Sequence, residues 1–94
     1  MSLTFEWDPD KATTNLRKHG VSFEEAMSAF ADLLSFAIPD PDHSHGEPRY
    51  VLLRVSYQRH LLVVSHTERG ETIRIINARR ASRREKRVYE EGED

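Results

Sequence analysis

Three apolar runs with short connections constrain the fold of this chain more than any other feature. The runs Tyr50–Tyr57, Leu61–His66 and Thr72–Ala78 are rich in β-branched residues, and brief polar connections around Gln58–His60 and Glu68–Glu71 separate them. A parallel pair of strands needs a crossover of about a dozen residues, whereas connections this short join antiparallel neighbours. The second half of the chain therefore predicts a three-stranded antiparallel meander.

The first half carries the signals of a strand followed by a helix. Apolar and polar residues alternate over Leu3–Trp7, which predicts a half-buried strand. Asp8 is placed as an N-cap before Pro9, a residue that fits the first helical position because its missing N–H is not needed there. The helix is expected to reach about His19 and to stop at Gly20 in a left-handed conformation.

A second helix is expected directly after that stop. Ser22 and Glu25 have the spacing of a capping box, and apolar residues follow at helical spacing, which predicts a core-facing stripe. The stripe consists of Phe23, Ala26, Met27 and Phe30. The next residues can extend this helix or form a strand that Pro39 ends; we favour a strand over Leu34–Ile38, followed by a polar loop over Pro39–Pro48.

Ser82 and Glu85 form another capping box, which predicts a C-terminal helix to about Glu91. The order is then strand, two helices, strand, meander and helix, without an internal repeat or a linker. We expect a single α+β domain over residues 1–94, with a small, mostly antiparallel sheet packed by the two N-terminal helices and with an additional helix at the C-terminus.

The composition excludes several classes of protein. The chain has no cysteine, which excludes disulfides and cysteine-ligated zinc or iron–sulfur sites. No stretch reaches the ~18 apolar residues of a membrane span, and the N-terminus lacks the pattern of a signal peptide. A domain of 94 residues has little core left for an enclosed cofactor pocket. We expect a cytoplasmic protein without a cofactor.

Charge is unevenly distributed along the chain, although the formal net charge is only -2. Seven of the 14 Lys and Arg residues lie in the 14-residue window Arg74–Arg87, whose only acid is Glu85. This positive end suits a polyanionic partner. Within it the arginines recur every four residues, so that they can follow a phosphate backbone or form a solvated, weakly packed helix that a partner protein binds. The repeats are Arg79, Arg83 and Arg87, and Arg80 and Arg84.

Lys11 and His19 are candidates for chemistry on a polyanion. Histidine suits proton transfer near neutral pH, and lysine suits the stabilisation of negative charge. The two residues are eight positions apart on one expected helix, about 80° in angle and about 12 Å in rise. They can border one groove, but they cannot share one phosphate without other elements. The alternatives are a histidine that complements the helix dipole and a solvated lysine.

The arginines of the last strand and its turn are further candidates. Simple alternation puts Arg74 on one face and Arg79 on the other, so they meet only if a bulge intervenes. The first face then holds Ile73, Ile75, Asn77 and Arg79, and the second holds Arg74, Ile76 and Ala78. Arg74 either faces a groove or pairs with a buried acid. Arg69, beside Gly70 in a turn, can bind phosphate or stay solvated.

The loop that precedes the meander contains several residues that can bind metals: Asp40, Asp42, His43, His45 and Glu47. These residues lie in a short, proline-bounded loop without a fixed geometry or recognisable supporting residues. We therefore expect a polar surface loop and no metal site.

The chain resembles the BrnT family of toxins in blocks whose order and spacing are kept over nearly its whole length. The blocks are Phe5–Asp8, Lys11, Asn15, Lys18–Phe23, His43–Arg49, Leu62–Val64, Thr67–Gly70, Ile73–Ile76, Ala78–Ala81, Arg84–Glu85 and Tyr89. Two departures stand out. Asn77 occupies a position where the family pattern leads us to expect serine, and Arg54–His60 lacks the glycine often found after the third strand.

The resemblance implies a RelE-like fold and an endoribonuclease that arrests translation. It also implies neutralisation by a BrnA antitoxin, whose ribbon-helix-helix part binds operator DNA. The leading interpretation is a toxin that cleaves RNA without a metal, with His19 in proton transfer and arginines as clamps on the phosphate and the transition state. The catalytic candidates are Lys11, His19, Arg69, Arg74 and Arg79; the RNA-binding candidates are Arg80, Arg83, Arg84 and Arg87.

The alternative is a binding module without catalysis, whose arginines dock nucleic acid or an acidic protein. One form of this alternative is an inactive relative that acts as a corepressor with its antitoxin. Asn77, at a position where serine is expected, favours this form. Pure binding falls steeply with ionic strength and leaves RNA intact, whereas catalysis leaves cut ends.

Overall fold

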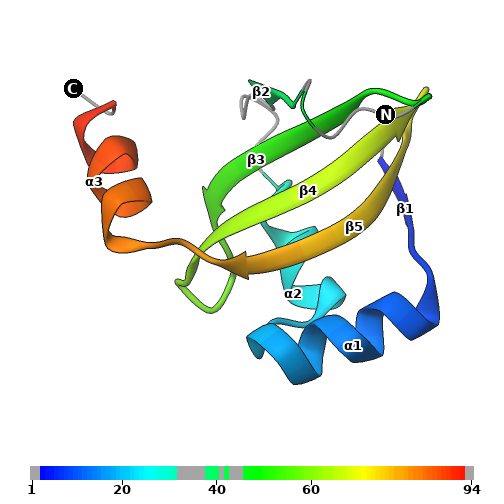
Figure 1. The fold of residues 1–94 in the computed structure, drawn as a ribbon, viewed down its shortest axis with the longest axis horizontal. Coiled ribbons are helices and arrows are strands. Elements are labelled where there is room, and N and C mark those ends of the chain that lie inside the picture. Colours follow the sequence, from blue (N-terminus) through cyan, green and yellow to red (C-terminus); the bar gives the residue numbers. More distant parts are fainter. Residues whose placement is uncertain (1–2, 32–37, 41, 43–45, 93–94) are drawn as a thin grey trace.

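A five-stranded sheet and three helices make up the computed structural model, which describes residues 3–31, 38–40, 42 and 46–92 (Figure 1). The elements are β1 (Thr4–Glu6), α1 (Pro9–His19), α2 (Phe23–Ser28), β2 (Ile38–Pro39), β3 (Arg49–Val55), β4 (Leu61–Arg69), β5 (Thr72–Arg80) and α3 (Arg83–Glu91). The predicted α+β class, with two N-terminal helices and a C-terminal helix, is confirmed.

The sheet is mostly antiparallel, in the order β1-β5-β4-β3-β2. β3, β4 and β5 pair in sequence order as antiparallel neighbours, which confirms the predicted meander. β1 is the parallel exception, and it pairs only with Thr72–Arg74 at the start of β5. Over the rest of β5, α1 lies beside the strand where a further strand would otherwise pair (Figure 1).

The local signals around α1 have the predicted effect. The Asp8 side chain accepts a hydrogen bond from the Asp10 N–H at 2.8 Å, and Pro9 is the first helical residue. Gly20 ends the helix with a φ of 71°, and its N–H donates to the Leu16 carbonyl at 2.8 Å. A residue with a Cβ would be strained in that left-handed conformation.

Asn15 attaches α1 to the sheet. Its side chain is buried, and its Oδ1 accepts from the Ala78 N–H at 3.1 Å while its Nδ2 donates to the Ala78 carbonyl at 2.8 Å. The same Nδ2 donates to the Val21 carbonyl at 2.9 Å. One side-chain amide therefore bonds both backbone groups of an edge residue, as a neighbouring strand would.

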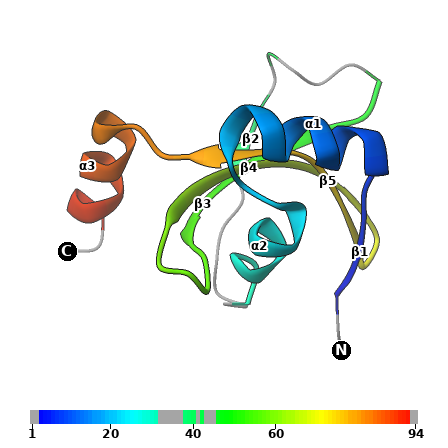
Figure 2. The ribbon, with the colours of Figure 1, turned by 90° about the horizontal axis from the view of Figure 1, so that it is seen from below.

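The hydrophobic core lies between the sheet and α2 (Figure 2). Phe23 and Ala26 are fully buried, and Phe30 packs edge-on against Phe5 with ring centroids 5.4 Å apart. Met27 was expected in the same stripe, but it is 37% exposed. The expected stripe is wrong at this position because the buried face of α2 also includes Glu25, which turns Met27, at the margin of the stripe, toward solvent.

The capping box predicted for α2 forms only in part. The Glu25 N–H donates to Ser22 Oγ at 3.0 Å, as predicted. The buried Glu25 carboxylate, however, accepts from Ser56 Oγ at 2.6 Å and lies 2.8 Å from His60 Nδ1. Its side chain thus fixes the β3–β4 hairpin on α2, an interaction between residues more than 30 positions apart that the local capping pattern does not reveal.

The two remaining predicted elements are found near their expected positions. Ile38 lies in β2, opposite Val51 of β3, and Pro39 is the last residue of this edge strand; positions 34–37 of the expected strand lie outside the described residues. α3 begins with a complete capping box of Ser82 and Glu85. It extends beyond the end of β5, away from the core, and none of its residues is buried (Figure 2).

No helix within the described ranges is long and apolar enough to cross a membrane.

We expect Asn15→Ala to lower the free energy of unfolding by about 2–4 kcal/mol, because it leaves buried backbone groups of Ala78 and Val21 without partners. Urea denaturation measures the change. Thr14→Ala, at an exposed position of the same helix, is the control and should stay within about 0.5 kcal/mol of the wild type. Equal stability of the two variants would contradict this role of Asn15.

Candidate functional site

A β-bulge decides which residues of β5 face away from the core. His66 pairs with Ile75, but Ser65 pairs with Asn77, so Ile76 is an extra residue in β5. The alternation therefore shifts by one residue: Ile75 is buried before the bulge and Ala78 after it. The expected alternation is wrong from Asn77 onward. Ile73, Ile75 and Ala78 face the core, and Arg74, Asn77 and Arg79 lie on the opposite face, here called the outer face.

The outer face carries a groove of about 770 Å³, the outer groove. Its apolar part is made by side chains of β2 to β5, and cations from three different elements reach it: Lys11 from α1, Arg49 from β3 and Arg79 from β5. The other lining residues are Ile38, Pro39, Asp40, Val51, Val63, Ser65, Ile76, Asn77 and Glu85. An open groove with cations at several points can hold a phosphate backbone across the sheet.

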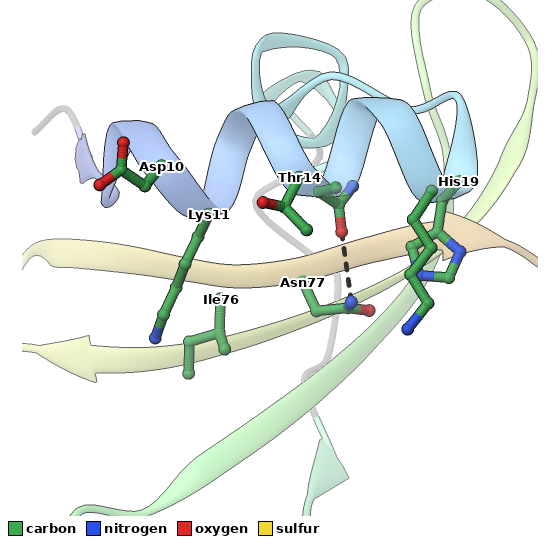
Figure 3. A pocket seen from close by; sticks show the side chains of 8 residues that line it. Asp10, Lys11, Thr14, His19, Ile76 and Asn77 are labelled. Carbon is green, nitrogen blue, oxygen red and sulfur yellow. Dashed lines mark hydrogen bonds between the residues drawn. The ribbon is translucent and has the colours of Figure 1, made fainter.

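A smaller hollow of about 280 Å³ adjoins the outer groove, between α1 and β5 (Figure 3). Lys11 and His19 lie toward opposite ends of it, with Asn77 between them. The Asn77 Nδ2 donates to Asn15 Oδ1 at 3.2 Å, so the anchor of α1 also holds this side chain. Lys11, Ile76 and Asn77 line both cavities. Lys11 and His19 thus border one cavity, the smaller hollow, as their spacing predicted.

Arg79 is held by a two-pronged ion pair with Glu85 of α3. Nη1 donates to Oε1 and Nη2 to Oε2, each at 2.8 Å. These hydrogen bonds raise the pKa of Arg79 above its ordinary value and lower the pKa of Glu85 to about 2. The guanidinium therefore stays charged and has a defined direction beside the outer groove.

The other two catalytic candidates lie toward the opposite end of the sheet. Arg74 donates to Glu6 of β1 at 2.7 Å, which matches the predicted alternative of an acid partner, although Glu6 is not buried. Arg69 donates to both carboxylate oxygens of Glu47, at 2.7 and 3.2 Å, and this interaction lowers the pKa of Glu47.

Arg69 is also far from His19 along the strands. Arg69 pairs with Thr72, five residues before Asn77 on β5, which corresponds to roughly 16 Å at the rise of a strand. The structure brings Lys11, His19 and Arg79 around the two adjoining cavities, and it does not bring Arg69 or Arg74 there.

Of the RNA-binding candidates, Arg83, Arg84 and Arg87 lie on α3, whereas Arg80 is the last residue of β5. Arg84 shares a hollow with Arg79, Leu53 and Val88, whereas Arg80 lines a different hollow with His60 and Tyr89. Arg83 and Arg87 are exposed on α3. The arginines that recur every four residues therefore lie on two elements, with Arg79 and Arg80 on β5 and the others on α3, and they do not form one continuous row.

Three residues contribute to the site in ways that the sequence did not predict. Asp40 and Arg49 line the outer groove, and Glu85 holds Arg79. Asp40 stands out in the sequence only as a possible metal ligand of the polar loop, and Arg49 directly follows that loop, which carries no periodic signal. Glu85 is predicted as part of a capping box and as the single acid of a basic window, and neither pattern reveals Arg79 as its partner.

The part of the chain that the structure describes contains no cluster of three or more His, Asp or Glu residues able to hold a metal ion. His43 and His45 of the polar loop lie outside that part, so the expected absence of a metal there stays a prediction.

The chain is similar to known proteins both in its sequence family and in its fold. A family model described as "Ribonuclease toxin, BrnT, of type II toxin-antitoxin system" matches residues 7–85. The fold is similar to the crystal structure of the Brucella abortus ribonuclease toxin BrnT, with a TM-score of 0.67 and 21% identity over 87% of this chain and 100% of that chain. No curated protein matches the sequence significantly. The RelE-like assignment stays a prediction.

We expect the Arg79–Glu85 pair to stabilise the protein in a pH-dependent manner. The folded-state pKa of Glu85 is depressed from 4.5 to about 2, so its contribution is fully present above pH 4.5 and is lost as the pH falls toward 2. Glu85→Gln should therefore lower the free energy of unfolding by roughly 1 kcal/mol or less near neutrality, because the pair is partly exposed.

Thermal unfolding of the wild type and of Glu85→Gln across this pH range measures their difference in stability. This difference should become smaller in acid. Glu90→Gln, an exposed acid on the same helix, should show no such narrowing. A wild-type advantage that stays constant down to pH 2 would refute the assignment.

Proposed function

Since the chain belongs to the BrnT family, the ribonuclease toxins of type II toxin–antitoxin systems, we propose that it is an endoribonuclease that cleaves RNA without a metal ion and so inhibits translation. The chain would act in the cytoplasm as a single toxin domain. Membership supports a ribonuclease in general terms, and the finer features of the proposal depend on the residues around the outer groove.

One observation carries the proposal: Lys11 and Arg79 approach the outer groove from α1 and β5, and His19 lies in the adjoining hollow. Two permanent cations suit the charge that develops on a phosphorane, and an imidazole suits proton transfer near neutral pH. Cleavage then needs the 2′-oxygen to bond to phosphorus as its proton leaves, while the 5′-oxygen departs with a proton. His19 is proposed for a proton transfer, and Lys11 and Arg79 for the electrostatic part.

Arg69 and Arg74 have a different part in this proposal. Their distance from His19 favours contacts with phosphates that flank the scissile one. Each now binds a carboxylate, Glu47 or Glu6, so a phosphate would have to replace or share that partner. Arg80, Arg83, Arg84 and Arg87 would extend the cationic path onto α3.

We further propose that a BrnA-like antitoxin neutralises the chain and that its ribbon-helix-helix part binds operator DNA. The toxin would reach DNA only through that complex. The type II family supports a protein antitoxin. α3 supports a protein contact as well, because it has no buried residue and exposes Val88.

We expect Lys11→Ala, His19→Ala and Arg79→Ala each to lower the rate of RNA cleavage by about 10²-fold or more, through loss of charge stabilisation or proton transfer. Cleavage of a defined RNA by purified protein in EDTA measures the rates, and growth after induction measures toxicity. Arg17→Ala is the matched control, because this exposed cation lies on the same helix but does not line the cavities.

Toxicity and RNA cleavage that survive all three substitutions in folded protein would refute these roles. Normal growth and intact RNA with the wild type would favour a corepressor without catalysis. Arrest with cut RNA, relieved by the protein encoded next to it, would support the toxin and its antitoxin. Loss of cleavage in EDTA, restored by a divalent ion, would contradict only the metal-free mechanism.

The arginines of α3 should act on binding and not on chemistry. We expect Arg83→Ala with Arg87→Ala to raise KM and leave kcat near the wild-type value. The slope of log K against log salt should fall by about 0.7 for each lost phosphate contact with single-stranded RNA. Titration of RNA at several salt concentrations measures the slope; an unchanged slope would exclude α3 from the RNA path.

A further inference from the structure

Glu85 makes more interactions than its place in a capping box requires. Its Oε1 accepts from the Ser82 N–H at 2.8 Å, which completes the cap of α3. The same carboxylate also accepts two hydrogen bonds from Arg79, one on each oxygen. One side chain therefore joins the first turn of α3 to the end of β5, directly beside the outer groove.

The remaining hydrogen-bond donors of Arg79 show what this arrangement leaves available. A guanidinium has five N–H donors. Nη1 donates to Glu85 and makes a long contact of 3.4 Å with the Arg80 carbonyl, and Nη2 donates one proton to Glu85. Among the described residues, no acceptor is bonded to Nε or to the second proton of Nη2. These two donors lie on one edge of the planar group, the edge that can bind a phosphate in two-pronged fashion.

The same contact also restricts the flexible side chain of Arg79. The Arg79 side chain is 39% exposed, so without a partner it would sample many rotamers, and binding to a phosphate would then have to order it. Interactions that fix a catalytic group before the substrate arrives lower the barrier of the reaction. An acid at this position would repel a phosphate if it were not neutralised, but Arg79 itself supplies that neutralisation.

We propose that Glu85 is a positioning residue of the ribonuclease site, which holds the Arg79 guanidinium so that its Nε–Nη2 edge is available to a phosphate in the outer groove. This inference rests on the proposed function, and specifically on the role of Arg79. It assigns α3 a part in the reaction, through the orientation of Arg79, in addition to any contact that its arginines make with RNA.

The test compares kcat and KM of Glu85→Gln with those of the wild type on a defined RNA. Glu85→Gln keeps the size of the side chain and removes its charge, so kcat should fall about ten-fold while KM changes less than about two-fold. In an Arg79→Ala background, Glu85→Gln should have no further effect on kcat, because the group that it orients is absent.

Ser82→Ala is the matched control, because it removes the hydroxyl of the cap and leaves the Glu85 carboxylate in place. It should weaken α3 but keep kcat near the wild-type value. If Glu85→Gln reduces the folded fraction seen by circular dichroism, Glu85→Asp replaces it. The aspartate keeps the charge but withdraws the carboxylate by one methylene, so the same loss of kcat is expected.

The outcomes separate the inference from the function on which it rests. An active wild type and an inactive Arg79→Ala, together with a fully active Glu85→Gln, would overturn the positioning role alone. Equal losses in Glu85→Gln and Ser82→Ala, or a further loss in the Arg79→Ala background, would overturn it in favour of a structural role for the α3 cap. A wild type that does not cleave RNA would overturn the proposed function and this inference with it.

Discussion

The attachment of α1 to the edge of β5 is the interaction on which the site depends. Asn15 bonds both backbone groups of Ala78, so a helix takes the place of a strand where the short β1 ends. This contact sets the height and rotation of α1 and thereby places Lys11 and His19 along the hollow beside β5. The Asn15 amide oxygen also accepts from Asn77, whose side chain lies between Lys11 and His19. The buried amide of Asn15 therefore fixes both the helix and the residue at the middle of the hollow.

The bulge at Ile76 is the second feature on which the site depends, because it decides the face of the sheet on which Asn77 and Arg79 lie. Without it, the alternation of β5 would send Asn77 and Arg79 into the core face, where an arginine is costly to bury. With it, both residues join the face on which Lys11 lies, and Ala78 remains buried beneath α1. Bulges are known to redirect side chains near functional sites. Here the bulge gives one strand both a continuous core contact and a cation beside the groove.

Three arginines of the sheet are each paired with an acid in this chain of net charge -2. Arg69 binds Glu47, Arg74 binds Glu6 and Arg79 binds Glu85. The acids hold the guanidinium groups in fixed directions and reduce their mutual repulsion, while each arginine keeps further donors for a phosphate. Under the proposed function, a phosphate that reaches these arginines would meet donors that are already oriented.

The sequence by itself determined the elements and their order, because those signals are local: the caps at Asp8, Gly20 and Ser82 act within one helical turn, and the short connections of the meander permit only antiparallel pairing. It also indicated Lys11 and His19 as residues bordering one groove. The tertiary structure decided the bulge at Ile76, the exposure of Met27 and the partners of Asn15, Glu25 and Arg79. These features depend on contacts between residues brought together only by the fold: the hydrogen bond that Asn15 Nδ2 donates to the Ala78 carbonyl spans 63 positions, and no local pattern encodes which of several possible partners such a side chain meets.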